Sequence, residues 1–235
     1  SDASTFDAYY YDATYHYVSL VYTYWKKTGS LAGYTTYLGD LEPAINSIPV
    51  TNHMVWVSGP DSWGWGWLDT LNYAGYDLAT SVLRYRAYDQ LSQMAYAAGD
   101  TARGASYAAE LPLVRKVLID NFWDATKGFY RNTTAITNNQ HNAVGSAMAV
   151  LWGACQATNR EVILDALYAA APGNSNALAG RGLWYAGAMR TLPLDEQWNS
   201  CTTNNGYVCG GYWPNLSYYG VSALALKHPA TAAQI

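Results

Sequence analysis

The strongest constraint in this sequence is a segment near its start that is apolar on two helical faces. One stripe recurs at helical spacing and consists of Tyr11, Tyr15, Val18, Tyr22 and Trp25. A second stripe on the same segment consists of Tyr10, Tyr17, Val21 and Tyr24. The helix is expected to end at Lys26, Lys27 and Gly29, because basic residues suit the negative helix end and glycine suits the turn beyond it. A helix that is apolar on two faces packs against neighbours on two sides.

The rest of the chain repeats the helical pattern. Further helices are predicted at about 31–48, 77–98, 101–121, 140–158, 161–171, 176–191 and 217–228, which makes about eight in total. Gly99 ends one helix, Asp100 caps the next, and Pro112 predicts a kink. Residues 122–131 predict a turn or hairpin, and no segment predicts a sheet-forming strand. Tight turns and longer loops alternate, so we expect an all-α single domain of stacked helical hairpins over residues 1–235.

Composition narrows the class of partner. Charged residues are only 13% of the chain and the net charge is -4, so nucleic acid is an unexpected partner. No apolar run reaches the ~20 residues that a membrane helix needs. The chain has 22 Tyr and 10 Trp but only 3 Phe, and rings with a flat apolar face and a polar edge suit sugar surfaces. The alternative is a core that happens to use Tyr. Low charge and many small polar residues suggest an extracellular, secreted protein.

The cysteines and glycosylation triplets fit secretion. Cys201 and Cys209 flank a short polar loop and could close a small disulfide ring, whereas Cys155 lies on an apolar helical face and is expected to be a buried free thiol. Asn132 and Asn215 each begin an Asn-x-Ser/Thr triplet. Such triplets also arise by chance.

The long interruption at residues 49–76 holds the first group of candidate site residues. Its stretch Asp61-Ser62-Trp63-Gly64-Trp65-Gly66-Trp67-Leu68-Asp69 alternates Trp with Gly, which is poor helix material. In an extended chain Trp63, Trp65 and Trp67 point the same way and offer flat faces to a sugar ring. Asp61 or Asp69 could hydrogen-bond a sugar hydroxyl or act as a catalytic acid. The alternative is an aromatic plug that closes the end of a barrel.

A second group surrounds Glu196. It lies in a loop two residues before Trp198, and a Gly-Gly-Tyr212-Trp213 turn follows. A carboxylate beside Trp is partly desolvated, which raises its pKa and suits it to proton transfer. Trp198, Tyr212 and Trp213 are therefore candidate substrate-binding residues around a catalytic Glu196. The alternative is an acidic loop residue exposed to water.

The remaining acidic and histidine residues carry weaker signals. His53 in the first loop and His141 at a helix start are candidate substrate-binding residues, although capping or structural roles are common for such positions. Glu42, Glu110 and Glu161 fall within predicted helices, where a solvated face is expected. No Cys/His spacing predicts a metal site and no Gly-rich phosphate loop exists, so we expect no metal and no cofactor.

Three stretches of the sequence resemble the six-hairpin (α/α)6-toroid glycosidases, most closely the α-L-rhamnosidase type of catalytic domain. They are Asp12–Gly29, with Ser30 where the family has Asp; Trp63-Gly64-Trp65 through Ala98-Gly99-Asp100; and Phe122-Trp123-Asp124 through Gln140-His141-Asn142-Ala143. A full toroid of this family has about twelve helices, so the resemblance implies an incomplete toroid, either the C-terminal two-thirds of a catalytic domain or a shortened relative. The acidic motif of the family is absent from this sequence, and a missing N-terminal segment or other subunits would then be partners.

The resemblance implies a secreted glycoside hydrolase, or part of one, that removes terminal sugars from a polysaccharide or glycoside. It also implies an inverting mechanism, in which one carboxyl protonates the leaving oxygen and the other activates water. Two alternatives remain open: a non-catalytic extracellular carbohydrate-binding protein on a degenerate toroid, and a helical scaffold that assembles through aromatic surfaces.

Overall fold

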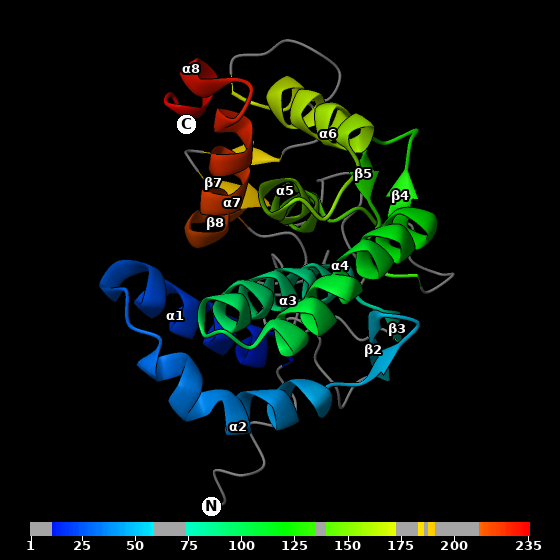
Figure 1. The fold of residues 1–235 in the computed structure, drawn as a ribbon. Coiled ribbons are helices and arrows are strands. Elements are labelled where there is room, and N and C mark those ends of the chain that lie inside the picture. Colours follow the sequence, from blue (N-terminus) through cyan, green and yellow to red (C-terminus); the bar gives the residue numbers. More distant parts are fainter. Residues whose placement is uncertain (1–10, 59–73, 135–139, 173–182, 186–187, 191–211) are drawn as a thin grey trace, which may run out of the picture.

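A computed structural model describes residues 11–58, 74–134, 140–172, 183–185, 188–190 and 212–235. The helices of these residues are α1 (Tyr11–Thr28), α2 (Ala32–Asn46), α3 (Leu78–Ala97), α4 (Thr101–Phe122), α5 (Ala143–Trp152), α6 (Ala157–Ala169), α7 (Pro214–Ala225) and α8 (Pro229–Ala232). The predicted all-α fold of helical hairpins is therefore confirmed (Figure 1).

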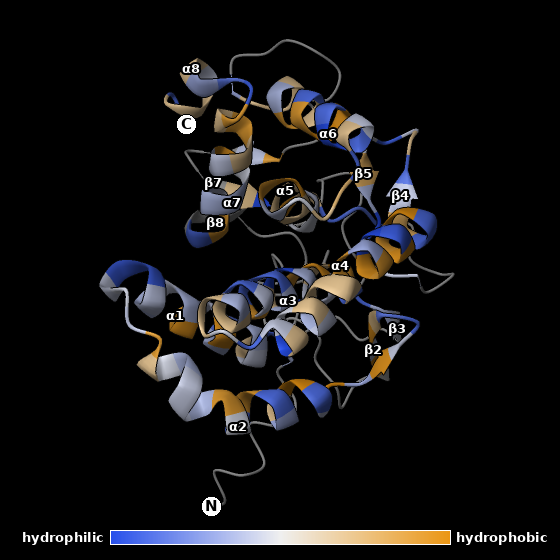
Figure 2. Ribbon diagram, in the orientation of Figure 1, coloured by the Kyte–Doolittle hydropathy of each residue, from blue (hydrophilic) through white to orange (hydrophobic). Residues whose placement is uncertain are grey.

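The helices form an inner row and an outer row. Along the inner row, α1 packs on α3, α3 on α5 and α5 on α7, while each of α2, α4, α6 and α8 packs on the inner helix that precedes it. Figure 1 shows α2 and α6 on the outside of this arrangement. The inner helix α5 is buried at every position from Ala143 to Val150, whereas Figure 2 shows hydrophilic and hydrophobic residues mixed along the outer α6. The core therefore lies between the two rows.

Connections of two lengths alternate along the described chain. Short connections (29–31, 98–100, 153–156 and 226–228) join each inner helix to its outer partner, and long ones (47–77, 123–142 and 170–213) lead from an outer helix to the next inner helix. Because each long connection ends where an inner helix begins, the N-terminal ends of α3, α5 and α7 share one end of the array. The long connections hold the candidate site residues of the sequence.

Short strands line the long connections, contrary to the expectation that none forms. The first connection holds β1 (Val50–Thr51), β2 (Met54–Ser58) and β3 (Ala74–Tyr76); the second holds β4 (Trp123–Asp124) and β5 (Phe129–Tyr130); the third holds β6 (Trp184–Tyr185), β7 (Ala188–Arg190) and β8 (Tyr212–Trp213). Neighbouring strands in all three sheets are antiparallel. The helix predicted at 176–191 is wrong over residues 183–185 and 188–190, where β6 and β7 pair as antiparallel strands; the rest of that range lies outside the described residues. The hairpin predicted at 122–131 is confirmed, and Gly128 takes a φ of 73° in its turn.

Polar caps fix the starts of the helices at both ends of the array. The side chain of Asp77 accepts a hydrogen bond from the backbone N–H of Thr80 at 2.6 Å, and that of Asp100 accepts one from Arg103 at 3.0 Å. The predicted cap of α4 by Asp100 is therefore confirmed. At the start of α5, Asn142 Oδ1 accepts from the backbone N–H of Gly145 at 2.6 Å.

Candidate functional site

The first candidate residue whose side chain the structure describes is His53, which lies in the tight turn between β1 and β2 of the first long connection. Asn52 and His53 have φ values of 49° and 64°, and the flanking residues Thr51 and Met54 pair with each other. Positive φ at both central residues is the geometry of a two-residue hairpin turn, which Asn tolerates well and His less well. The turn therefore projects the imidazole from a fixed position.

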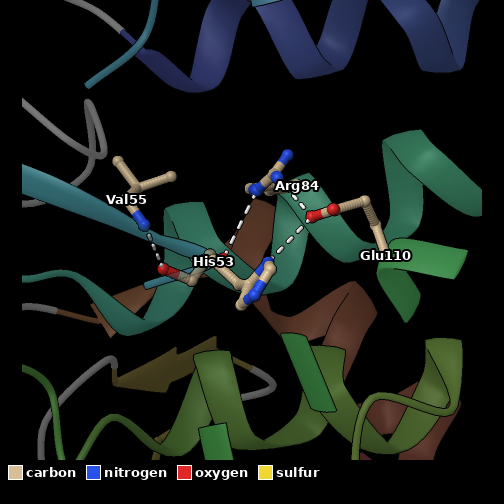
Figure 3. Close-up of polar contacts among 5 residues, drawn as sticks. His53, Val55, Arg84 and Glu110 are labelled. Carbon is tan, nitrogen blue, oxygen red and sulfur yellow. Dashed lines mark hydrogen bonds and ion pairs between the residues drawn. The ribbon is translucent and has the colours of Figure 1, made fainter. Parts of the chain in front are cut away.

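An ion-pair cluster holds this turn against the helices (Figure 3). His53 Nδ1 lies 3.1 Å from Glu110 Oε2 of α4, and Arg84 Nη2 of α3 donates to the same oxygen at 2.8 Å. Arg84 Nε also donates to the backbone oxygen of His53 at 3.4 Å, while the backbone N–H of Val55 donates to Ser81 Oγ at 3.1 Å. Glu110 was expected on a solvated helix face. Instead it joins the first long connection to α3 and α4.

The cluster combines a buried arginine, Arg84, with a partly exposed histidine, His53. Arg84 is buried and its guanidinium lies over the Tyr88 ring at 4.1 Å, so the cation that faces Glu110 is fixed. The His53 side chain is 34% exposed to solvent, so it can reach a ligand at the surface. Substrate binding by His53 stays a prediction that this geometry permits.

His141 belongs to a second, buried cluster at the β4–β5 hairpin. Its Nε2 lies 3.2 Å from Asp124 Oδ2, and Arg131 Nη2 lies 3.6 Å from the same oxygen. Burial alone would raise the pKa of Asp124, but hydrogen bonds from His141 and from the backbone N–H groups of Thr126 and Lys127 outweigh it and lower the pKa. The His141 side chain is only 1% exposed. This burial contradicts the prediction that His141 contacts substrate directly. The position of His141 supports a structural role instead.

The glycosylation triplet at Asn132 is also buried. Asn132 has 0% of its surface exposed, and its Oδ1 accepts a hydrogen bond from Asn142 Nδ2 at 2.8 Å. Its backbone oxygen accepts from Leu78, so Asn132 fastens the second long connection to the start of α3. A glycan on this side chain is incompatible with such packing, which corrects the expectation for Asn132. Asn215 is exposed at the start of α7, and its glycosylation stays a prediction.

The other candidate residues lie largely outside the described part of the chain. The candidates outside the described residues belong to the first and third long connections. They are Asp61, Trp63, Trp65, Trp67, Asp69, Glu196, Trp198 and the predicted disulfide partners Cys201 and Cys209. For Tyr212 and Trp213 only the backbone is described: they form β8 and pair with Arg190 and Met189 of β7. Cys155 is a buried free thiol as predicted, and burial raises its pKa to about 11.

The described residues also contain a groove away from the long connections. It has a volume of about 550 Å³, lies between α1 and α2 beside the short connection 29–31, and is lined by Tyr17, Leu20, Val21, Tyr24, Ala32, Gly33, Thr36 and Tyr37. Among described residues, no group of three or more His, Cys, Asp or Glu side chains is placed to hold a metal ion. No described helix is long and apolar enough to cross a membrane.

Sequence reasoning did not single out the two arginines of α3. Arg84 and Arg86 lie in the first half of α3, where every residue from Leu78 to Ala87 except Arg86 is buried, and a charge in such a stretch requires a partner or a ligand. That conflict between burial and charge was the available signal. Asp124 was likewise recognised only as part of a motif.

Two rows of helices joined by alternating short and long connections define an α/α-toroid type of fold. No protein-family model and no curated protein matches the sequence. Among solved structures, the chain is similar to a rhamnosidase from Klebsiella oxytoca with rhamnose bound, at 17% identity and a TM-score of 0.61 over 97% of this chain and 37% of the rhamnosidase. It is also similar to a sialidase, at 12% identity and a TM-score of 0.57 over 92% of this chain and 18% of the sialidase.

These comparisons show a glycosidase-like fold, in agreement with the resemblance stated from the sequence. At such identities the likeness concerns the fold alone. The chain spans about a third of the rhamnosidase and less than a fifth of the sialidase.

Proposed function

We propose that the chain is, or belongs to, a secreted glycoside hydrolase that removes terminal sugars by an inverting two-carboxylate mechanism. The observation that carries this proposal is the placement of its chemistry-bearing residues along the sequence. The aromatic and carboxylate candidates all fall within the first and third long connections, and these connections lead to the same end of a glycosidase-like array. Function on such folds belongs to loops held by a rigid scaffold.

In this proposal Glu196 is the general base that activates water, and Asp61 or Asp69 is the acid that protonates the leaving oxygen. Trp63, Trp65 and Trp67 would stack on the sugar. The described part of the site supplies a rigid frame: Glu110, with its cationic partners, fastens the first connection to α3 and α4, and the pairs of Asp124 with His141 and Arg131 brace the second connection internally. A frame of this kind suits catalytic groups that must keep a fixed separation.

A panel of aryl glycosides, including an aryl α-L-rhamnoside and an aryl sialoside, tests the proposal. Proton NMR of the first product formed reports its anomeric configuration. We expect hydrolysis of at least one glycoside with inversion. A chain that hydrolyses none of them and no polysaccharide would contradict the proposal, and retention of configuration would contradict the mechanism alone.

The alternative is a non-catalytic extracellular protein that binds carbohydrate or assembles through its aromatic surface. The groove between α1 and α2 favours this second function, because the Leu20, Tyr24 and Tyr37 side chains on its walls are exposed. Light scattering coupled to size exclusion distinguishes the assembly form. A concentration-dependent increase in mass that Tyr24→Ser abolishes supports assembly, and a constant monomer mass contradicts it.

A further inference from the structure

Arg86 is a half-buried cation in the middle of the inner row of helices. It lies on α3, and its guanidinium carbon sits 4.3 Å from the centroid of the Trp152 ring at the end of α5. Within the described residues, the Arg86 guanidinium forms no hydrogen bond and no ion pair. Its contact with the Trp152 ring is a cation–π contact. A half-buried guanidinium without an anion is costly unless a ligand supplies one.

Two other arginines of this structure combine a ring contact with hydrogen bonds or an ion pair. Arg84 lies over the Tyr88 ring and pairs with Glu110. Arg115 lies over the Tyr85 ring, and it donates to the hydroxyl of the same tyrosine at 2.5 Å and to the backbone oxygen of Gly153 at 3.0 Å. Arg86 shares the ring contact but not the hydrogen bonds, which separates it from arginines with a structural role.

Partly exposed aromatic side chains from the other inner helices lie near Arg86. Trp152 of α5 contacts it, and Tyr22 of α1 and Tyr218 and Tyr219 of α7 are close enough to influence its pKa. The rings of Trp152 and Tyr219 meet edge to face with centroids 5.8 Å apart. None of these side chains is fully buried, and Arg86 itself is partly exposed to solvent. The hydroxyls of Tyr218 and Tyr219 form no hydrogen bond with described residues.

Arg86 supplies the positive charge at this position. Burial lowers the pKa of Arg86, with nearby tyrosines opposing the shift, and an arginine still stays protonated at neutral pH. Burial also lowers the pKa of His16 despite the opposing charge of Asp12, which keeps this histidine neutral at neutral pH. Arg86 forms no ion pair with a described residue: the charge of Asp12 acts on His16 and Tyr219, and Asp89 accepts a hydrogen bond from Gln93 Nε2 at 2.9 Å.

We propose that Arg86 binds the carboxylate of a uronic acid residue, while Trp152 and Tyr219 pack against its sugar ring. A planar carboxylate carries one negative charge and matches the fork of a single guanidinium. A phosphate carries more charge and usually needs more than one cation. The aromatic faces suit the C–H face of a sugar, and the free tyrosine hydroxyls suit its hydroxyl groups. This binding requires no hydrolysis, so it stands or falls separately from the proposed function.

Calorimetric titration with trigalacturonate and glucuronate tests the proposal, because the methyl ester of each ligand keeps the sugar and removes the charge. We expect the acids to bind and the esters to bind about 10- to 100-fold more weakly, which is what a charged hydrogen bond contributes. Arg86→Gln should lose a similar factor for the acids and leave the esters unchanged. Arg115→Gln is the matched control, because it removes an arginine that contacts a ring but already forms hydrogen bonds within the protein. This variant should bind the acids like the parent.

Three results would overturn the proposal. They are equal binding of acid and ester, parent-like binding by the Arg86→Gln variant, and no binding of either acid. Displacement of the acids by equimolar sulfate would mark a general anion site and would overturn the assignment to uronic acids. If Arg86→Gln does not fold, Arg86→Lys keeps the charge without the fork, and its binding of the acids should still fall several-fold.

Discussion

Replacing Glu110 by Gln tests whether the ion-pair cluster at His53 fastens the first long connection. The substitution keeps the shape and one acceptor oxygen but removes the charge that faces Arg84, whose side chain is only 6% exposed. Breaking a fully buried pair from one side costs about 3–5 kcal/mol. Because the Glu110 side chain is 27% exposed and Gln still accepts a hydrogen bond, we expect a loss of about 2 kcal/mol in the free energy of unfolding.

Urea denaturation measures this loss. With a slope of about 3 kcal/mol per molar, the midpoint of Glu110→Gln should fall by about 0.7 M at an unchanged slope. Glu161→Gln is the control: its carboxylate pairs with Lys227 at 3.0 Å, and the two side chains are 51% and 33% exposed. Surface pairs contribute about 0–1 kcal/mol, so its midpoint should barely move. Equal shifts in the two variants would refute the reasoning.

Three further predictions concern packing, pH and thiols. Gly220→Ala should destabilise the chain by about 1–3 kcal/mol in the same denaturation assay, because the new methyl would lie 2.7 Å from a Trp184 ring carbon. Gly39→Ala has open space on α2 and should stabilise the chain by up to about 1 kcal/mol. Asp124→Asn should cost about 1–2 kcal/mol at neutral pH; since folding lowers the pKa of this carboxyl, the gap to the parent should close in pH-dependent unfolding as the pH falls below about 4. Cys155 should react with a thiol reagent only after denaturation, because it is buried and its pKa is raised to about 11, and three thiols in the unreduced denatured chain would exclude the disulfide between the other two cysteines.

Periodicity predicted the helical rows well, because apolar spacing over three or more turns leaves little choice of structure. The first helix is apolar on two faces because it packs on both α2 and α3. Capping residues such as Asp100 fixed the helix boundaries closely, since their hydrogen bonds are local. The alternation of short and long connections followed from the same boundaries.

The long connections were harder to predict. Residues 183–190 contain Ala and Met and resemble a helix by propensity, but β6 and β7 pair with each other and β7 with β8, whose backbone supplies the hydrogen bonds. Such pairing depends on contacts distant in sequence, and local propensity does not encode it. The roles of Glu110 and His141 were missed for the same reason. Glu110 has partners on α3 and at the β1–β2 turn, and His141 becomes buried only when the β4–β5 hairpin places Asp124 against it.

The most direct test of the central claim, hydrolysis at the long-connection end, is the turnover of Glu196→Gln beside that of Glu161→Gln on the glycoside that the parent hydrolyses best. General base catalysis contributes about 10²–10⁴-fold, so Glu196→Gln should lose turnover by about that factor with sugar binding largely retained. Glu161 lies on the outer helix α6 and pairs with Lys227, so its variant should turn over like the parent. A Glu196→Gln variant as active as the parent would contradict the account.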